Sequence, residues 1–341
     1  MLALQAVTDR DLCAAVPALE PAQARALIAS IHRDRPLAPR PGLPRAALGA
    51  ALARGELPTL AVVAADASRR DPFSKLLLAT ADGHRVECVT MPLERPGRVS
   101  LCVSSQAGCA LACAFCATGR LGLARNLASW EIVEQVRLAR RRLAPGQRVH
   151  GVVFQGMGEP LANLDRVAAA VAVLTAPYAL AIDARAITVS TAGLPDGIRR
   201  LAALAPRVRL AVSIGSPRPD VRAELMPISR AHPLAEVLAA AADHARATRL
   251  APLWAITLLA GVNDSPEDAR LLAALTRDFA AETGLVPRLS VIDYNPVAGA
   301  PFRASDATAA FRDQLAAHGV RSHRRYSGGA DIAAACGQLA G

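Results

Sequence analysis

The pattern of hydrophobic and polar positions divides the chain into two parts. Apolar positions recur at helical spacing in residues 1–55, where prolines separate the stretches. From about residue 98, short apolar runs that predict strands alternate with amphipathic stretches that predict helices. The helices expected in the first part are 12–16, 22–31 and 43–52, followed by strands at 59–63, 75–79 and 85–91. The later strands are expected at 100–104, 149–154, 186–190, 208–213, 252–258, 289–293 and 320–326, and the helices at 130–143, 161–174, 196–204, 234–247, 266–281 and 308–318.

This alternation predicts parallel strands joined by right-handed crossovers. About six βα units are too few for a closed eight-unit barrel, so we expect an α/β fold with a partial (βα)6 barrel. Its chemistry should lie at the C-terminal ends of the strands. Ser129 should cap the helix 130–143, and 81–83 should form a hairpin turn. The expected domains are a helical accessory domain (1–55), a β-rich connecting segment with a short hairpin (56–97), the barrel (98–326) and a C-terminal loop (327–341).

Charge adds a preference for polyanions. The formal net charge is +10, and Lys75 is the only lysine among 39 lysines and arginines. Such a balance favours nucleic acid as a partner through phosphate contacts, although a basic enzyme without a nucleic-acid role has the same composition.

The sequence shows neither a signal-peptide pattern nor a membrane-spanning segment. Residues 1–10 lack a basic start followed by an apolar core, and no uncharged apolar run reaches about 18 residues. We therefore expect a cytoplasmic protein. Three of the seven cysteines are closely spaced, which favours metal or redox chemistry in a reducing compartment over a disulfide framework.

The closely spaced cysteines are Cys109, Cys113 and Cys116, which follow the first strand of the alternating part. Thiolates are the preferred ligands of iron–sulfur clusters, and a loop with only three leaves one iron of a [4Fe-4S] cluster open. A structural zinc site usually pairs two C-x2-C elements or adds histidines, and no second element follows here. Buried cysteines are the other alternative, and Phe115 suits either a lid on the cluster or a core position. The spacing and its strand context resemble the cluster loop of radical S-adenosylmethionine (SAM) enzymes.

Two further cysteines narrow the resemblance. Taken alone, Cys102 and Cys336 would be packed hydrophobes more often than reagents. Cys102 lies in the stretch LCVSSQ, however, and Cys336 lies in the ending AACGQLAG. Both stretches resemble the radical SAM RNA methyltransferases that modify adenosine, the RlmN/Cfr family. Supporting motifs are QGMGEPLAN (155–163), TVSTAG (188–193), LAVS (210–213) and YNP (294–296), so the similarity extends from about residue 85 to 341.

The resemblance implies a site and its cofactors. The three loop cysteines would hold one [4Fe-4S] cluster, and two SAM molecules would be used per turnover. The SAM contacts implied by the family motifs are Gly158, Glu159, Ser190, Ser213, Ile214, Gly215 and Asn295. In this family, histidine typically stands at the position of Gly215. The N-terminal helical region also lacks the family's usual aromatic residues.

The resemblance also implies a mechanism. One SAM would methylate Cys336, and a second SAM on the cluster would give the radical that activates this methyl group for addition to adenine. Glu87 would remove the ring proton, and Cys102 would release the product by forming a transient disulfide with Cys336. Without that role, Glu87 would be an exposed carboxylate at a strand end.

The resemblance implies rRNA, tRNA or both as substrate, methylated at adenine C2. An external electron donor such as flavodoxin or ferredoxin would reduce the cluster, and we expect a monomer that does not associate with membranes. One alternative is C8 methylation or another radical SAM reaction. An alternative of another class is a non-catalytic iron–sulfur or zinc protein that binds RNA through its basic surface.

Overall fold

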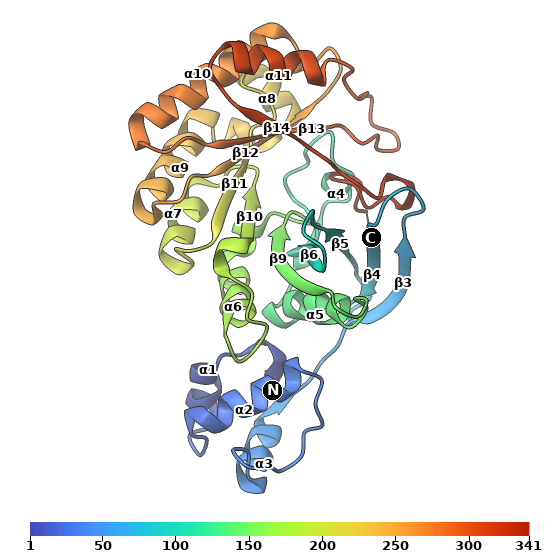
Figure 1. The fold of residues 1–341 in the computed structure, drawn as a ribbon, viewed down its shortest axis with the longest axis vertical. Coiled ribbons are helices and arrows are strands. Elements are labelled where there is room, and N and C mark those ends of the chain that lie inside the picture. Colours follow the sequence, from blue (N-terminus) through green and yellow to red (C-terminus); the bar gives the residue numbers. More distant parts are fainter. Residues whose placement is uncertain (341) are drawn as a thin grey trace.

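One sheet runs through the larger part of the molecule. The computed structural model of the chain describes residues 1–340. Parallel strands form the barrel part of the sheet, and their order in space follows their order in the sequence (Figure 1). They are β6 (Arg98–Val103), β9 (Arg148–Phe154), β10 (Ile187–Thr191), β11 (Arg209–Ser213), β12 (Leu253–Leu258), β13 (Arg288–Asp293) and β14 (Ser322–Arg325).

Helices join the successive parallel strands and cover the outer face of the sheet (Figure 1). They are α5 (Ser129–Arg140), α6 (Leu164–Thr175), α7 (Pro195–Leu204), α9 (Leu234–Thr248), α10 (Pro266–Thr283) and α11 (Thr308–Ala317). The predicted partial (βα)6 barrel is therefore confirmed. A 3-10 turn, η2 (Pro160–Asn163), occupies the first residues of the helix predicted at 161–174.

Three antiparallel strands extend the same sheet beyond the barrel. These are β3 (Ala61–Ala67), β4 (Ser74–Ala79) and β5 (Arg85–Pro92), and the predicted turn at 81–83 joins the last two. Because β5 pairs with β6, the segment that we expected to connect two units is continuous with the barrel sheet.

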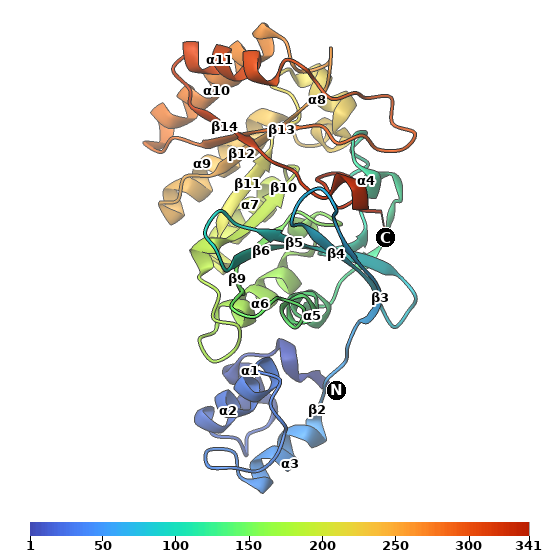
Figure 2. The ribbon, with the colours of Figure 1, turned by 45° about the vertical axis from the view of Figure 1, so that its right-hand side comes forward.

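The N-terminal residues form a helical unit at one end of the molecule (Figures 1 and 2). Its elements are β1 (Leu2–Ala3), η1 (Leu4–Ala6), α1 (Asp9–Ala15), α2 (Pro21–His32), α3 (Arg45–Arg54) and β2 (Gly55–Glu56). Polar contacts hold it to the barrel: Arg137 Nη2 on α5 donates to the Ile31 carbonyl at 3.1 Å, and Tyr178 Oη donates to Asp9 Oδ1 at 2.8 Å.

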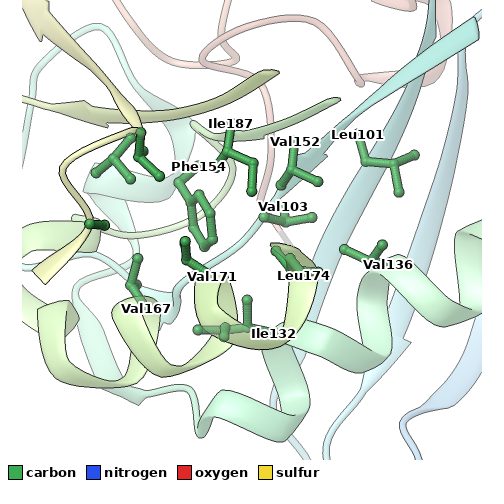
Figure 3. Packing of buried hydrophobic residues seen from close by; sticks show 14 of the residues in the cluster. Leu101, Val103, Ile132, Val136, Val152, Phe154, Val167, Val171, Leu174 and Ile187 are labelled. Atoms are coloured by element: carbon green, nitrogen blue, oxygen red, sulfur yellow. The ribbon is translucent and has the colours of Figure 1, made fainter. Parts of the chain in front are cut away.

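The barrel core lies between the sheet and its helices. Figure 3 shows Val103, Val152 and Phe154 from the sheet against Val136 and Val171 from the helices. All are buried, as the alternating apolar pattern requires.

The pattern did not indicate several short elements. Those that follow a strand's C-terminal end or lie in the C-terminal segment are β7 (Gln106–Gly108), α4 (Ala117–Arg120), β8 (Leu123–Asn126), α8 (Pro219–Leu225), η4 (Pro227–Arg230) and η5 (Ala330–Ile332). Another, η3 (Ala184–Ala186), directly precedes β10. The predicted cap at Ser129 is wrong by one residue. Ala128 is the N-cap of α5, and its N–H donates to Glu131 Oε2 at 2.7 Å. Within residues 1–340, no helix is long and apolar enough to cross a membrane.

Candidate active site

A small hairpin shapes the cysteine loop. Strands β7 and β8 pair on either side of it, and the Cys109 N–H donates to the Gly122 carbonyl at 2.8 Å. Gly108 has a φ of +76°, and a Cβ there would lie 2.0 Å from the Gly122 oxygen. Only glycine therefore fits at this crossing. On its other side the loop contacts α8, because the Ala114 N–H donates to the Leu225 carbonyl at 2.9 Å.

The loop opens onto a cavity at the C-terminal ends of the strands, with about 950 Å³ of empty space that is partly open to solvent. Nine of the residues predicted for the site line it: Cys109, Cys113, Cys116, Gly158, Glu159, Ser190, Ser213, Gly215 and Cys336. Residues from most of the barrel strands and from the C-terminal segment thus converge on one space. This is where ligands bind in folds of this class.

The thiols of the loop suit a cluster. Burial raises the pKa of the Cys109 thiol to about 11 and that of Cys113 further, so these thiols need a metal to become thiolates at neutral pH. Within residues 1–340, no three His, Cys, Asp or Glu side chains are close enough to hold a single metal ion. Three separated thiols fit a cluster, which offers each of them a different iron, better than a structural zinc site.

Glu159 is a buried acceptor at the wall of the cavity, with 3% of the residue exposed. Its Oε1 accepts from the Leu161 N–H at 3.0 Å and its Oε2 from the Ala192 N–H at 2.9 Å. Burial raises the pKa of this carboxyl to about 7, although these hydrogen bonds lower it. A ligand ammonium group would supply the positive charge that favours the carboxylate form.

The ends of β10 and β11 also line the cavity. Ser190 and Ser213 reach the cavity, whereas Ile214 is fully buried and its N–H donates to the Ala255 carbonyl at 2.8 Å. Gly215 has a φ of +69°, and a Cβ there would meet Met226 Sδ at 2.4 Å. The local backbone and Met226 therefore require glycine at this position.

Cys336 is held at the edge of the cavity by polar contacts from three directions. Its N–H donates to Ser327 Oγ at 2.7 Å, and its carbonyl accepts from Asn295 Nδ2 at 3.2 Å. Gln155 Nε2 lies 3.4 Å from its Sγ, and Arg325 Nη1 donates to Gln155 Oε1 at 2.8 Å. Burial raises the pKa of the Cys336 thiol, and the Arg325 charge opposes this effect. Asn295 faces the C-terminal segment and is not among the residues that line the cavity.

A second, smaller cavity of about 420 Å³ adjoins the first, and both Cys102 and Cys336 line it. Burial, and to a smaller extent the nearby Cys336, raise the pKa of the Cys102 thiol to about 12. Both residues are free cysteines. The two thiols therefore share one small cavity.

Glu87 lies within β5, with 4% of the residue exposed, and not at an exposed strand end. Its Oε1 forms an ion pair with Lys75 Nζ at 2.7 Å, and its Oε2 accepts from the Ala340 N–H at 2.9 Å. The register Val89↔Cys102 puts Glu87 on the same face of the sheet as Cys102. Glu87 lines neither cavity, because the C-terminal segment covers it.

The sequence analysis did not predict two residues that contribute to the site, Gln155 and Arg222. Gln155 belongs to a motif that we noted, and its position at the end of β9 could have indicated a role. Arg222, which is buried beneath the cysteine loop on α8, gives no such signal because α8 is short and precedes no strand.

Comparisons with known proteins agree with this geometry. Residues 103–272 match the radical SAM superfamily. A protein of Sorangium cellulosum named as a probable RNA methyltransferase is 58% identical, over 93% of this chain and 87% of that protein. The dual-specificity RNA methyltransferase RlmN of Syntrophobacter fumaroxidans is 43% identical, over 79% of this chain and 77% of that protein.

Among solved structures, a radical SAM methyltransferase from Sphaerobacter thermophilus matches with a TM-score of 0.89 and 36% identity, over 99% of each chain. The similarity therefore includes the N-terminal helical unit as well as the barrel.

Proposed function

Because this chain belongs to the RlmN-type radical SAM RNA methyltransferases, we propose that it methylates an adenosine ring carbon in RNA through an S-methylcysteine on Cys336. The position on the ring is C2, and the substrate is rRNA, tRNA or both. One observation carries the proposal: Cys336 lines the cavity of the three loop cysteines and also the cavity of Cys102. A methyl carrier needs access both to the cofactor and to the thiol that releases the product.

The residues of this chain would hold the cofactors in a defined way. Cys109, Cys113 and Cys116 would bind a [4Fe-4S] cluster, and Glu159 with the ends of β10 and β11 would hold SAM at its open iron. When bound, the cluster and SAM supply radical chemistry that amino-acid side chains lack. Two SAM molecules would be consumed per turnover, one to methylate Cys336 and one to activate the methyl group.

Cys336 must lose its proton to act as a nucleophile. Burial raises the pKa of the Cys336 thiol, the charge of Arg325 offsets part of this rise, and Gln155 Nε2 donates to the sulfur at 3.4 Å. The flanking contacts from Ser327 and Asn295 limit the positions that the sulfur can take. These groups would therefore prepare Cys336 for methyl transfer.

Glu87 would act as the base that removes the ring proton. Its Oε1 lies 2.7 Å from Lys75 Nζ. The Ala340 N–H covers its second oxygen. The C-terminal segment would therefore have to move before Glu87 could contact the adenine ring. The same movement would bring Cys336 to Cys102.

The net charge of +10 suits RNA as a partner, and an acidic one-electron carrier such as flavodoxin or ferredoxin would supply the reducing equivalents.

A substitution at Cys336 tests the proposal. Cys336→Ala should keep the iron and should still cleave SAM after reduction, because the cluster cysteines are intact. It should lose RNA methylation by at least about a thousandfold, since the methyl carrier is gone. Cys13→Ala, in the N-terminal unit, is the matched control and should behave as the unchanged protein. If Cys336→Ala still methylates RNA, the proposed two-cysteine mechanism is wrong.

Mass spectrometry of nucleosides from the product RNA tests the position. We expect 2-methyladenosine, and 8-methyladenosine alone would overturn the C2 assignment. A protein that holds the cluster but forms no 5′-deoxyadenosine after reduction would instead be a binding protein.

A further inference from the structure

Arg222 on α8 is a fully buried arginine without a carboxylate partner. Its Nε donates to the Ile214 carbonyl at 2.8 Å, and its Nη2 donates to the carbonyls of Ala192 at 2.7 Å and Ser213 at 3.4 Å. Its Nη1 donates to Ser229 Oγ. It takes part in no ion pair within residues 1–340, whereas the buried Arg137 pairs with Glu134 at 2.7 Å.

These contacts join the ends of two strands. Ala192 follows β10, Ser213 ends β11 and Ile214 follows it, so one guanidinium fixes the spacing between the two loops that line the cavity. A lysine could not reproduce this, because its ammonium lacks the planar fork of donors.

An isolated buried cation is unfavourable unless an anion balances it. An arginine guanidinium stays charged at neutral pH. The cysteine loop packs against the same short helix. The Ala114 N–H donates to the Leu225 carbonyl at 2.9 Å, and Cys113 packs against the hydrophobic cluster of Leu225 and Met226. An iron–sulfur cluster bound to the loop would therefore bring an anion next to α8.

We propose that Arg222 is a positioning residue with two effects: it supplies the countercharge of the three-thiolate cluster, and it fixes the ends of β10 and β11 against SAM. A cluster held by three thiolates is an anion, and one-electron reduction adds a further negative charge. A cation buried beside it in a medium of low dielectric constant therefore favours the reduced form. The inference rests on the proposed cluster, but it does not depend on the RNA substrate.

The test separates the effect of the positive charge of Arg222 from the effect of its planar set of hydrogen-bond donors. The full chain is reconstituted with iron and sulfide under anaerobic conditions, and its reduction is followed by electron paramagnetic resonance against potential. Arg222→Met should shift the equilibrium towards the oxidised cluster by at least tenfold, which lowers the potential by about 59 mV. Arg222→Lys should change the equilibrium constant for cluster reduction by less than tenfold relative to the unchanged protein. Its Kd for SAM should rise at least tenfold. Arg137→Met removes another buried arginine, far from the loop, and should alter neither quantity.

An unchanged potential in Arg222→Met would overturn the countercharge. If Arg222→Met loses its iron, Arg222→Lys tests the countercharge instead. A shift of the equilibrium towards the oxidised cluster by tenfold or more in Arg222→Lys, despite the retained charge, would overturn the proposal. A purely structural arginine would weaken SAM binding equally in both variants and leave the potential unmoved. If the unchanged protein assembles no cluster, the proposed function itself fails.

Discussion

At the scale of single residues, the ionisation of Glu159 links SAM binding to pH. Burial raises the pKa of its carboxyl from 4.5 to about 7. The folded protein without SAM therefore holds a proton over this window, and its stability falls as the pH rises through it. A bound ammonium group would favour the carboxylate, so SAM should release this proton.

We therefore expect the Kd for SAM to decrease as the pH rises from 6 to 8, by up to about tenfold per pH unit below the pKa of Glu159. Equilibrium dialysis with the cluster-loaded protein measures this dependence. Glu159→Gln should bind SAM more weakly and without the pH dependence. A Kd independent of pH in the unchanged protein would contradict the assignment of Glu159 to the ammonium group.

Gly215 gives a second prediction for a single residue. Gly215→His introduces the residue that the family resemblance led us to expect, but here it combines a left-handed backbone with a collision at Met226. We expect the free energy of unfolding to fall by about 2 kcal/mol or more. Adding Met226→Ala should recover part of the loss, because it removes the collision but not the backbone strain. Denaturant unfolding measures both, and equal stability of Gly215→His and the unchanged protein would refute the account.

At the scale of elements, the β7–β8 hairpin holds the cysteine loop. Gly108→Ala should disrupt this hairpin, since the added Cβ would lie 2.0 Å from a backbone oxygen. We expect the iron content after reconstitution to drop by more than half. Gly122→Ala is the matched control. Its φ of +73° gives the same backbone strain, of about 1 kcal/mol, but nothing lies within 4 Å of the new Cβ. Equal iron content in the two variants would show that the close approach is unimportant.

The elements also show what a sequence pattern can predict. The barrel strands and their helices follow from local periodicity, because burial on one face repeats along each element. The β7–β8 pair and α8 are too short for such a signal, and contacts distant in the sequence determine them. The cap predicted at Ser129 is misplaced by one residue, because Ala128 is the N-cap and its N–H donates to the Glu131 carboxylate and not to a serine hydroxyl.

The candidate site divides in the same way. The spacing of the loop cysteines indicated the cluster site, and the resemblance of the QGMGEPLAN motif and of the C-terminal ending to one family indicated Glu159 and Cys336. The burial of Glu87 against Lys75 arises from the pairing of β4 with β5, and Arg222 acts on backbone carbonyls that carry no sequence signature.

At the scale of the whole molecule, the excess of positive charge should strengthen RNA binding and should have little effect on the cleavage of SAM. We expect the affinity for RNA to fall by about tenfold or more between 50 and 200 mM salt, because bound phosphates release counterions. Reductive cleavage of SAM without RNA should change far less over this range. Filter binding and 5′-deoxyadenosine release measure the two. If the affinity for RNA did not change with salt concentration, the contacts between the protein and RNA would be mainly uncharged.

The continuous sheet from β3 to β14 has a consequence for building hybrids between relatives. Glu87 and Cys102 lie on neighbouring strands of one hydrogen-bonded ladder, although the sequence pattern changes between them. A crossover point in the loop 93–97 would combine the β5 of one relative with the β6 of another across a single hydrogen-bonded ladder. A crossover in the linker 57–60 would exchange only the N-terminal helical unit and leave the ladder intact. The natural module for transplantation therefore begins at β3, about forty residues before the barrel.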